Sequence, residues 1–393
     1  MMKTRNELLV FDLSEYKARL EKVRENMRKD GIDVALITAQ EDNTYLVGHP
    51  YGPPPCGVCL IIPLDGKITH IGRLIEKGNV ELILGKTVDR ALFWQDAPEM
   101  QQVSSDSYNM IGGVLKEQGL ESQRIGVQMG ANSFTVLNFE ILKKALPKAI
   151  FVDATNLVER CRLIKSPAEI ACLRRAARIA SKGCAAGIEA VREGVSENDV
   201  AAAIIDAMLE CLDYESTWDW PKTASGPRAA RAHTTWSGRI LREGDTVSLE
   251  IPASVNRYHA VTLRTVSVGP PSERMQKVAD AVRKGLEAAI EAIKPGAKAG
   301  DVDRACRSVI EKAGFGEYFR HRTGYTTGID WVQQLSVNLV PGNPTPLRAG
   351  MTFHVIPFCM IFGEGAIGMS ETVLVTEEGA EVLTELDRKL YIK

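Results

Sequence analysis

The sequence predicts two domains, an α/β domain followed by an α+β domain. A chain of 393 residues has room for two domains at about 100–200 residues each. Strand-like and helix-like segments alternate over the first 160 residues, as they do in α/β domains. The later segments mix helices with antiparallel strands, which is typical of α+β domains. We therefore expect domains over residues 1–160 and 161–393.

Apolar spacing predicts the elements of the first domain. Apolar residues at helical spacing predict a helix over 14–29, which Gly31 ends. Val34–Ile37 is a short apolar run and reads as a buried strand. Further strands are expected over 57–62, 68–71, 91–94 and 125–127, with helices over 74–84, 105–118 and 134–145.

A strong helix start opens the second domain. Ser166-Pro167-Ala168-Glu169 combines a capping serine, a proline at the first helical position and a glutamate three residues after the cap. This helix should run to about Val191, and Ser196 should open another that ends near Leu212. Later helices are expected over 271–292 and 301–313, with strands within 214–269 and around 318–328, 351–358 and 366–375.

Composition excludes several classes of partner. The formal net charge is −2, so no broad field favours nucleic acid or an anionic membrane. No segment approaches the roughly 20 apolar residues of a membrane span, and residues 1–11 lack the apolar stretch of a signal peptide. We expect a cytoplasmic protein with no nucleic-acid or membrane partner.

The eight cysteines are scattered, so the sequence predicts no disulfide framework. Cys56 and Cys59 have the spacing of a redox motif or half a zinc site. They precede a strand-like run, however, whereas a thioredoxin-like motif opens a helix, and a zinc site needs a second ligand pair. Buried structural thiols are the favoured interpretation.

Four motifs of the second domain together resemble the prolidase/creatinase superfamily. Their order and spacing make the combination specific. The resemblance implies a pita-bread fold over about 160–393, weaker similarity across the N-terminal domain, and a homodimer. The motifs are RLIKSPAEI at 162–170, EGDTV at 243–247, AGMTF at 349–353 and SETVLVT at 370–376.

The resemblance also shows which residues of this chain fall at the five metal-ligand positions of the family's peptidases. Peptidases of this superfamily hold two divalent ions with two Asp, one His and two Glu, and a bridging water becomes the nucleophile. Valine and isoleucine carry no ligand atom, and tyrosine and serine are weak ligands for an isolated divalent ion. We therefore expect no metal and no other cofactor. The five positions fall here at Glu250, Val261, Tyr325, Ile356 and Ser370.

Within the superfamily, the chain is more similar to the ectoine-hydrolase group than to the creatinases. Creatinases have their catalytic histidine where His233 falls, but their glutamate positions hold Leu263 and Ile356 here. The N-terminal pocket segment, residues 51–56, and residues 330–346 match less well. Shared phrases include AHTTW at 232–236, LE at 249–250, RYH at 257–259, RTV at 264–266, GY at 324–325 and MTFHVIP at 351–357.

Four residues are catalytic candidates. In the ectoine-hydrolase group the glutamate matching Glu250 attacks an amidine carbon, although it can also serve as base for a water or form a structural ion pair. His233 would protonate the leaving nitrogen, with a structural role as the alternative. Tyr325 would donate a hydrogen bond to the substrate. Glu371 would orient His233 or bind a cationic amidine, or else form a salt bridge.

Six further residues are candidates for substrate binding. Two histidines in strand patterns either line the pocket or pack in the core. Two arginines either grip a carboxylate through a bidentate fork or are structural, and two tryptophans either enclose a cationic ring or pack in the core. They are His259, His354, Arg264, Arg322, Trp220 and Trp236.

These expectations favour a metal-independent hydrolase of a non-peptide C–N bond in a small zwitterion. A cyclic amidine is the first choice of substrate and a guanidino compound the second. A metal-dependent Xaa-Pro peptidase is one alternative, and a non-catalytic binding member of the fold is the other.

Overall fold

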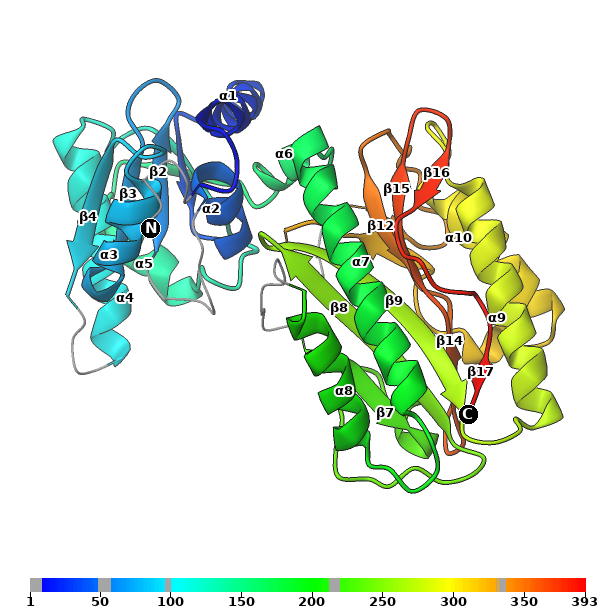
Figure 1. Cartoon of the computed structure of the whole chain (residues 1–393). Coiled ribbons are helices and arrows are strands. Elements are labelled where there is room, and N and C mark those ends of the chain that lie inside the picture. The colour runs from blue at the N-terminus through cyan, green and yellow to red at the C-terminus, as the bar shows by residue number, and fades with distance from the viewer. Residues whose placement is uncertain (1–8, 49–57, 96–99, 212–219, 330, 332–336) are drawn as a thin grey trace. The chain divides into compact units, whose positions relative to one another are not determined.

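The computed structural model describes residues 9–48, 58–95, 100–211, 220–329, 331 and 337–393, with only the backbone at 100–105 (Figure 1). The chain forms two compact units, Met1–Arg162 and Leu163–Lys393. The expected boundary at 160/161 lies two residues earlier. Among the described residues, no helix is long and apolar enough to cross a membrane.

The N-terminal unit contains a six-stranded mixed sheet in the order β4-β3-β2-β1-β5-β6. The two pairings of β2, with β1 and with β3, are antiparallel, and the others are parallel. Two helices, α4 and α5, pack their apolar residues on one face of this sheet. The strands are β1 (Val34–Ile37), β2 (Cys59–Pro63), β3 (Thr69–Arg73), β4 (Arg90–Trp94), β5 (Arg124–Val127) and β6 (Ile150–Asp153).

Most of the expected helices of this unit are present. The helix expected over 74–84 is instead three short pieces, and Gly78 lies inside it, a residue that weakens a helix interior. The helix over 40–47 and the strand over 150–153 were not expected. The helices are α1 (Leu13–Asp30), α2 (Gln40–Val47), η1 (Leu74–Glu76), α3 (Lys77–Asn79), η2 (Val80–Leu84), α4 (Met100–Glu117), α5 (Val136–Ala145) and α6 (Glu159–Arg162).

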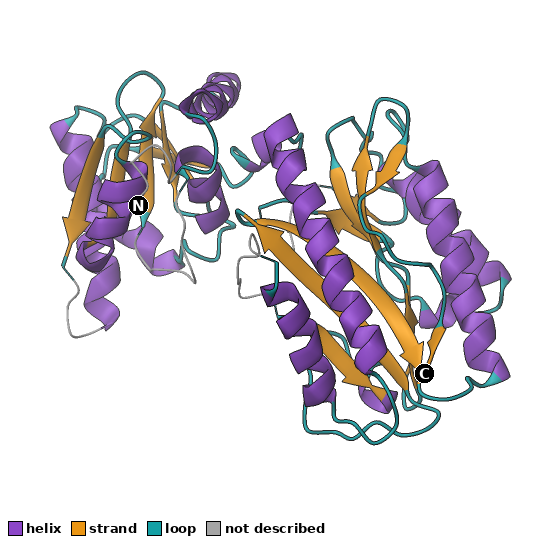
Figure 2. Ribbon diagram, in the orientation of Figure 1, coloured by secondary structure: helices purple, strands orange, loops and turns teal. Residues whose placement is uncertain are grey.

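The C-terminal unit layers helices against sheets in which every strand pairing is antiparallel except that of β17 with β9 (Figure 2). One sheet has the order β17-β9-β8-β7, and α7 runs along β8 and β9. A second has the order β11-β10-β12-β15-β16, and β13 pairs with β14. The helices are α7 (Pro167–Ala190), α8 (Glu197–Leu209), η3 (Gly226–Arg228), α9 (Glu273–Ala292), α10 (Ala299–Lys312) and η4 (Gly316–Tyr318).

Eleven strands, from β7 to β17, lie in the described part of this unit, and several of them line its large core. The strands are β7 (Lys222–Ser225), β8 (Thr246–Val255), β9 (Tyr258–Ser267), β10 (Gly324–Thr326), β11 (Asn338–Leu339), β12 (Thr352–Val355), β13 (Phe358–Ile361), β14 (Gly365–Gly368), β15 (Glu371–Val375), β16 (Ala380–Val382) and β17 (Tyr391–Ile392). The large core lies between α9, α10 and the strands from β11 to β15.

Local chemistry fixes the start of α7 as expected. The Ser166 side chain accepts a hydrogen bond from the Glu169 backbone N–H, and the Glu169 carboxylate accepts one from the Ser166 backbone N–H. The Tyr258 hydroxyl also donates to Glu169, at 2.8 Å. This bond ties the helix N-terminus to β9.

The β8–β9 hairpin is the frame of the unit. Its ten residue pairs are closed by a two-residue turn in which Asn256 and Arg257 both have positive φ, the geometry of a type I′ turn. Pro252 is tolerated in β8 because β7 pairs only as far as Glu250, so no neighbour requires a proline N–H on that side.

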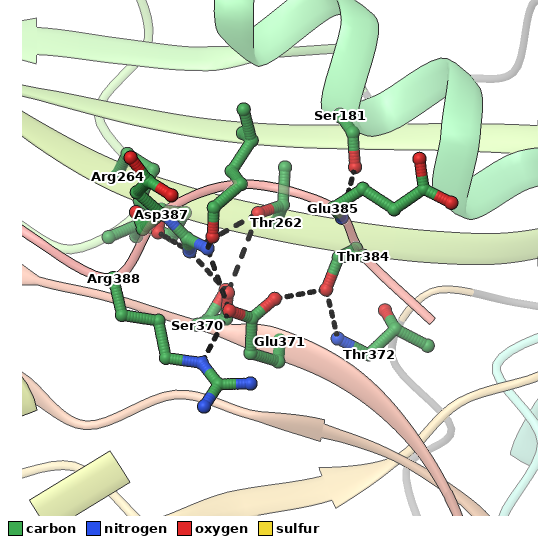
Figure 3. Close-up of polar contacts among 12 residues, drawn as sticks. Ser181, Thr262, Arg264, Ser370, Glu371, Thr372, Thr384, Glu385, Asp387 and Arg388 are labelled. Atoms are coloured by element: carbon green, nitrogen blue, oxygen red, sulfur yellow. Dashed lines mark hydrogen bonds and ion pairs between the residues drawn. The ribbon is translucent and has the colours of Figure 1, made fainter. Parts of the chain in front are cut away.

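A buried ion pair joins β9 to β15 and to the chain after β16. The Arg264 side chain is fully buried, and its Nη2 lies 2.7 Å from Oε1 of Glu371. Arg264 also donates to the backbone carbonyls of Ser370, Leu386 and Asp387. Figure 3 shows Arg388 and Thr384 completing the surroundings of the Glu371 carboxylate. Every charge in this network therefore has a partner.

We predict that Glu371→Gln lowers the free energy of unfolding by about 3–5 kcal/mol, because it leaves the Arg264 charge buried without its counterion. Urea denaturation followed by circular dichroism measures the loss. Glu381→Gln is the matched control, since Glu381 pairs with Arg174 on the surface and should cost at most about 1 kcal/mol. A stable Glu371→Gln protein without activity would contradict this structural role.

Candidate active site

A cavity of about 190 Å³ lies in the C-terminal unit. Strand alternation explains one wall, because Ser248 and Glu250 are two residues apart on β8 and share a face. Register adds their neighbours: Lys222 of β7 and Leu263 of β9 lie on either side of Glu250. All four residues line the cavity.

Glu250 is half-buried, with its exposed part facing the cavity. Loss of hydration raises the pKa of its carboxyl to about 7, while the positive charge of Lys222 acts in the opposite direction. The Lys222 ammonium lies 3.4 Å from the centroid of the Trp331 ring, a cation–π contact. A carboxyl with a pKa near neutral pH suits a general base, which must take up and release a proton at that pH.

Two histidines face the cavity from loops. His233 is exposed and has a φ of 61°, a left-handed conformation that costs a non-glycine residue some strain. His321 hydrogen-bonds through Nδ1 to the Arg322 carbonyl oxygen at 2.8 Å. That bond requires a proton on Nδ1, so the neutral ring has its acceptor at Nε2. Burial, with the nearby Arg322 charge, lowers the pKa of His321.

Tyr325 begins a chain of hydrogen bonds that runs away from the cavity. Its hydroxyl accepts a bond from Nε1 of Trp331 at 3.1 Å and lies 3.0 Å from Nδ1 of His354. Nε2 of His354 lies 2.7 Å from Oγ of Ser370. Burial is the main cause that lowers the pKa of His354 to about 3, so its imidazole is neutral at physiological pH.

Ser248 carries a buried hydroxyl for which no hydrogen-bond partner exists among the described residues. A buried polar group without a partner costs about 1–3 kcal/mol. Since Ser248 lines the cavity beside Glu250, a bound molecule can supply the missing partner after a rotation about χ1.

The cavity does not bring together all of the residues that the sequence suggested. Glu250, His233 and Tyr325 line it. Glu371 and Arg264 do not, because they form the ion pair between β9 and β15.

The other expected substrate-binding residues also lie off the cavity wall. His354 sits behind Tyr325, and His259 is buried with Nδ1 bonded to the Arg257 carbonyl oxygen. Arg322 stacks over the ring of Tyr325, 4.3 Å from its centroid, and donates to Asn338. Two tryptophans meet edge to face with ring centroids 6.1 Å apart; they are Trp220, which is exposed, and Trp236.

Of the two cysteines at redox-motif spacing, the structure describes Cys59. Cys56 lies outside the described residues. Cys59 is fully buried on β2, and burial raises the pKa of its thiol. A protonated thiol without exposed surface suits a structural role.

The positions that hold metal in the resembling peptidases do not fit metal ions here. Val261, Tyr325 and Ile356 belong to one apolar cluster, together with Leu263 and Trp331. The position at Ser370 is occupied by a hydroxyl that pairs with His354. Among the described residues, no group of three or more His, Cys, Asp or Glu side chains could hold a metal ion. Glu250 remains as the one carboxylate of the set.

Sequence reasoning missed four residues of the cavity. Lys222 and Ser248 follow from the pairing of Glu250 with β7 and from its alternation along β8. His321 lies four residues before Tyr325, and Trp331 lies six after it. Lys222 could have been predicted from the register of β7 against β8, but the sequence does not reveal that register.

Comparisons with known proteins agree with this architecture. Residues 171–377 match metallopeptidase family M24, and residues 19–164 match the creatinase/prolidase N-terminal domain. The chain is 34% identical to the hydrolase/peptidase y4tL of Sinorhizobium fredii, over 98% of each chain. It is 29% identical to the ectoine hydrolase of Halomonas elongata, over 98% of this chain and 99% of that one.

A solved structure extends the likeness to the whole fold. The prolidase of Thermococcus sibiricus superposes with a TM-score of 0.86 at 29% identity, over 96% of this chain and 99% of that one. The expected α/β N-terminal domain and pita-bread C-terminal domain are thereby confirmed. The protein belongs to metallopeptidase family M24 and carries a creatinase/prolidase-type N-terminal domain.

Proposed function

We propose that this protein is a metal-independent hydrolase of a non-peptide C–N bond in a small zwitterionic compound. A cyclic amidine of the ectoine type is the first choice of substrate, and a guanidino compound is the second. One observation carries the proposal: Glu250 is a desolvated carboxyl in a cavity where the family's other metal positions are apolar or hydrogen-bonded elsewhere. The similarity to an ectoine hydrolase supports it.

The cavity suits a compact ligand with charge on one side. Its volume of about 190 Å³ is below the roughly 300–1,000 Å³ of drug-sized pockets. Glu250 and Lys222 lie on neighbouring strands, and Arg231, His233 and His321 add ionisable groups from loops. Leu263, Ile356 and Phe358 give the cavity apolar surface. A small zwitterion can meet both kinds of surface at once.

Glu250 performs the central step in either of two ways. As a nucleophile, its carboxylate oxygen bonds to the sp² carbon between two nitrogens, and the C=N π electrons move onto nitrogen. As a base, it takes a proton from water while the water oxygen forms that bond. In the first route, water then adds to the same carbon and the bond to the Glu250 carboxylate breaks, which regenerates the carboxylate. In both routes one water is consumed, and an amidine becomes an amide and an amine.

The other cavity residues complete the reaction. His233 gives a proton to the departing nitrogen, so the amine leaves as a neutral group when the C–N bond breaks. Tyr325 donates a hydrogen bond to the tetrahedral intermediate that forms at the sp² carbon. A homodimer in the cytoplasm is part of the same proposal.

A metal-dependent Xaa-Pro dipeptidase is the competing function, because relatives and solved neighbours carry that name. The side chains at the ligand positions argue against it, since only Glu250 keeps a carboxylate. A binding protein without catalysis is the third possibility, and the same experiment separates all three.

We predict that EDTA-treated protein adds one water to a cyclic amidine such as ectoine, because no step of the proposed chemistry uses metal. Mass spectrometry of a panel of ectoine, hydroxyectoine, creatine and Xaa-Pro dipeptides gives the product masses. Glu250→Gln should abolish turnover but retain binding, as measured by calorimetry.

Two results of this panel would refute the proposal. Turnover of dipeptides alone, and only after metal is restored, identifies a peptidase. Binding without turnover of any compound, with Glu250→Gln binding equally well, identifies a binding protein.

We predict that kcat/KM rises with pH through an apparent pKa of about 7, because Glu250 must be ionised. Raising the pH has the opposite effect on stability. Folding raises the pKa of the Glu250 carboxyl from 4.5 to about 7, so the folded protein binds more protons than the unfolded chain between these values. As the pH rises from 4.5 to about 7, the free energy of unfolding of the wild type therefore falls relative to that of Glu250→Gln. An acidic limb near 4.5, the ordinary value of a glutamate, would contradict the raised pKa of Glu250.

We predict that Ser248→Ala keeps or raises stability, by up to about 1 kcal/mol, since its hydroxyl has no partner to lose in the part of the chain that the structure describes. KM should rise about tenfold through loss of one hydrogen bond to the substrate. Ser225→Ala is the matched control, because Ser225 is buried on the neighbouring strand and bonds to Glu197 and Arg239. That variant should lose stability, and a comparable loss in Ser248→Ala would contradict the assignment.

A further inference from the structure

Arg231 is an arginine of the cavity wall that the rest of the chain does not engage. It lines the cavity together with His233, from the connection between β7 and β8. Its side chain is exposed and makes no hydrogen bond, ion pair or ring contact in the part of the chain that the structure describes. The donor N–H groups of its guanidinium are therefore open to a bound molecule.

The two arginines that the sequence suggested for binding a carboxylate are engaged elsewhere. Arg264 pairs with Glu371 at 2.7 Å, and Arg322 donates to Asn338 at 2.6 Å. Neither of them lines the cavity. Among the described residues of the wall, Arg231 is the one arginine. A carboxylate inside the cavity would therefore meet the guanidinium of Arg231.

The charges of the wall favour a negative group. Lys222 and Arg231 both line the cavity, whereas Glu250 is the one carboxyl among the described lining residues. Even with Glu250 ionised, the wall carries an excess of positive charge. A guanidinium binds a carboxylate through two parallel N–H···O bonds. A carboxylate on the ligand would thus both satisfy Arg231 and balance the charge of the wall.

A buried glutamate fixes the segment that carries Arg231. Glu197, the first residue of α8, is fully buried, and its carboxylate accepts a hydrogen bond from the Ser237 hydroxyl at 2.7 Å. Arg228 forms an ion pair with the same carboxylate, and its carbonyl oxygen accepts a bond from the Arg231 backbone N–H at 3.0 Å. The segment 228–237 is therefore held at both ends. A binding group on a fixed segment has less freedom to lose when a ligand binds.

We propose that Arg231 binds the carboxylate of the zwitterionic substrate and so determines which compounds the cavity accepts. This inference rests on the proposed function, because it assigns a binding group to the negative part of the proposed substrate. The C–N centre of a compact molecule held in this way is left for Glu250 on β8. His233, the proposed proton donor, lies two residues after Arg231. One short segment thus carries both the group that selects the substrate and the group that protonates it.

Two compounds that differ only at the carboxylate test this assignment. The probes are ectoine and its carboxamide, in which a neutral amide replaces the carboxylate, and calorimetry gives their dissociation constants. The wild type should bind ectoine about 10- to 100-fold more tightly, as expected for a hydrogen-bonded charge pair. Arg231→Gln should weaken the binding of ectoine by that factor and leave the carboxamide nearly unaffected. Arg231→Lys should lie between them, because it keeps the charge but loses the planar fork.

Arg242→Gln is the matched control. Arg242 is an exposed arginine on the same connection to β8, its side chain also has no partner within the described ranges, and it does not line the cavity. The control removes the same charge, so it should leave both dissociation constants unchanged. Circular dichroism checks that each variant is folded.

The results separate this inference from the proposed hydrolysis. Loss of the preference for ectoine in Arg231→Gln supports the carboxylate site, and it does so even if the wild type hydrolyses no compound and the proposed hydrolysis fails. Equal affinity of the wild type for ectoine and its carboxamide, or no binding of either, overturns the carboxylate site. A preference that persists in Arg231→Gln also overturns it, even if the protein is a hydrolase.

Discussion

The buried ion pair between Arg264 and Glu371 is the constraint on which the cavity depends. Arg264 is next to Leu263 on β9, so strand alternation directs its side chain away from the cavity that Leu263 lines. The guanidinium holds β15 and the segment after β16 against that far side. Leu263 also bridges to Ser370 through the backbone. The cavity wall and the serine that contacts His354 are thus fixed by one network behind them.

Replacement of ligand side chains changes the electrostatics of the site as well as its capacity for metal. A bound cation would stabilise the ionised form of a neighbouring carboxylate. Here the other ligand positions are apolar or hydrogen-bonded elsewhere, and desolvation raises the pKa of Glu250 to about 7. Side chains that provide no charge beside Glu250 are thus consistent with a carboxyl whose pKa is raised by burial.

The sequence predicted those elements whose signals are local. The capping box at Ser166 and the apolar run Val34–Ile37 needed no tertiary information. The β8–β9 turn was missed because Asn256 and Arg257 adopt positive φ without a glycine. Site residues depended on register: Glu371 follows Ser370 directly, and a shift of one residue moves a side chain to the other face of a strand. Glu371 therefore belongs to the ion pair, while Ser370 contacts His354.

The cavity is polarised, and that polarity limits what it can bind. Lys222 and Glu250 bring ionisable groups from β7 and β8. Arg231, His233 and His321 add ionisable groups from loops, whereas Tyr325 is backed by a neutral imidazole and Ile356 and Phe358 carry no charge. A ligand that places a charge against Leu263, Ile356 or Phe358 leaves that charge on apolar surface, which is costly. A compact molecule whose charges both lie near β7 and β8, and whose neutral side meets Tyr325, avoids that cost. A small zwitterion of the proposed kind can have this distribution.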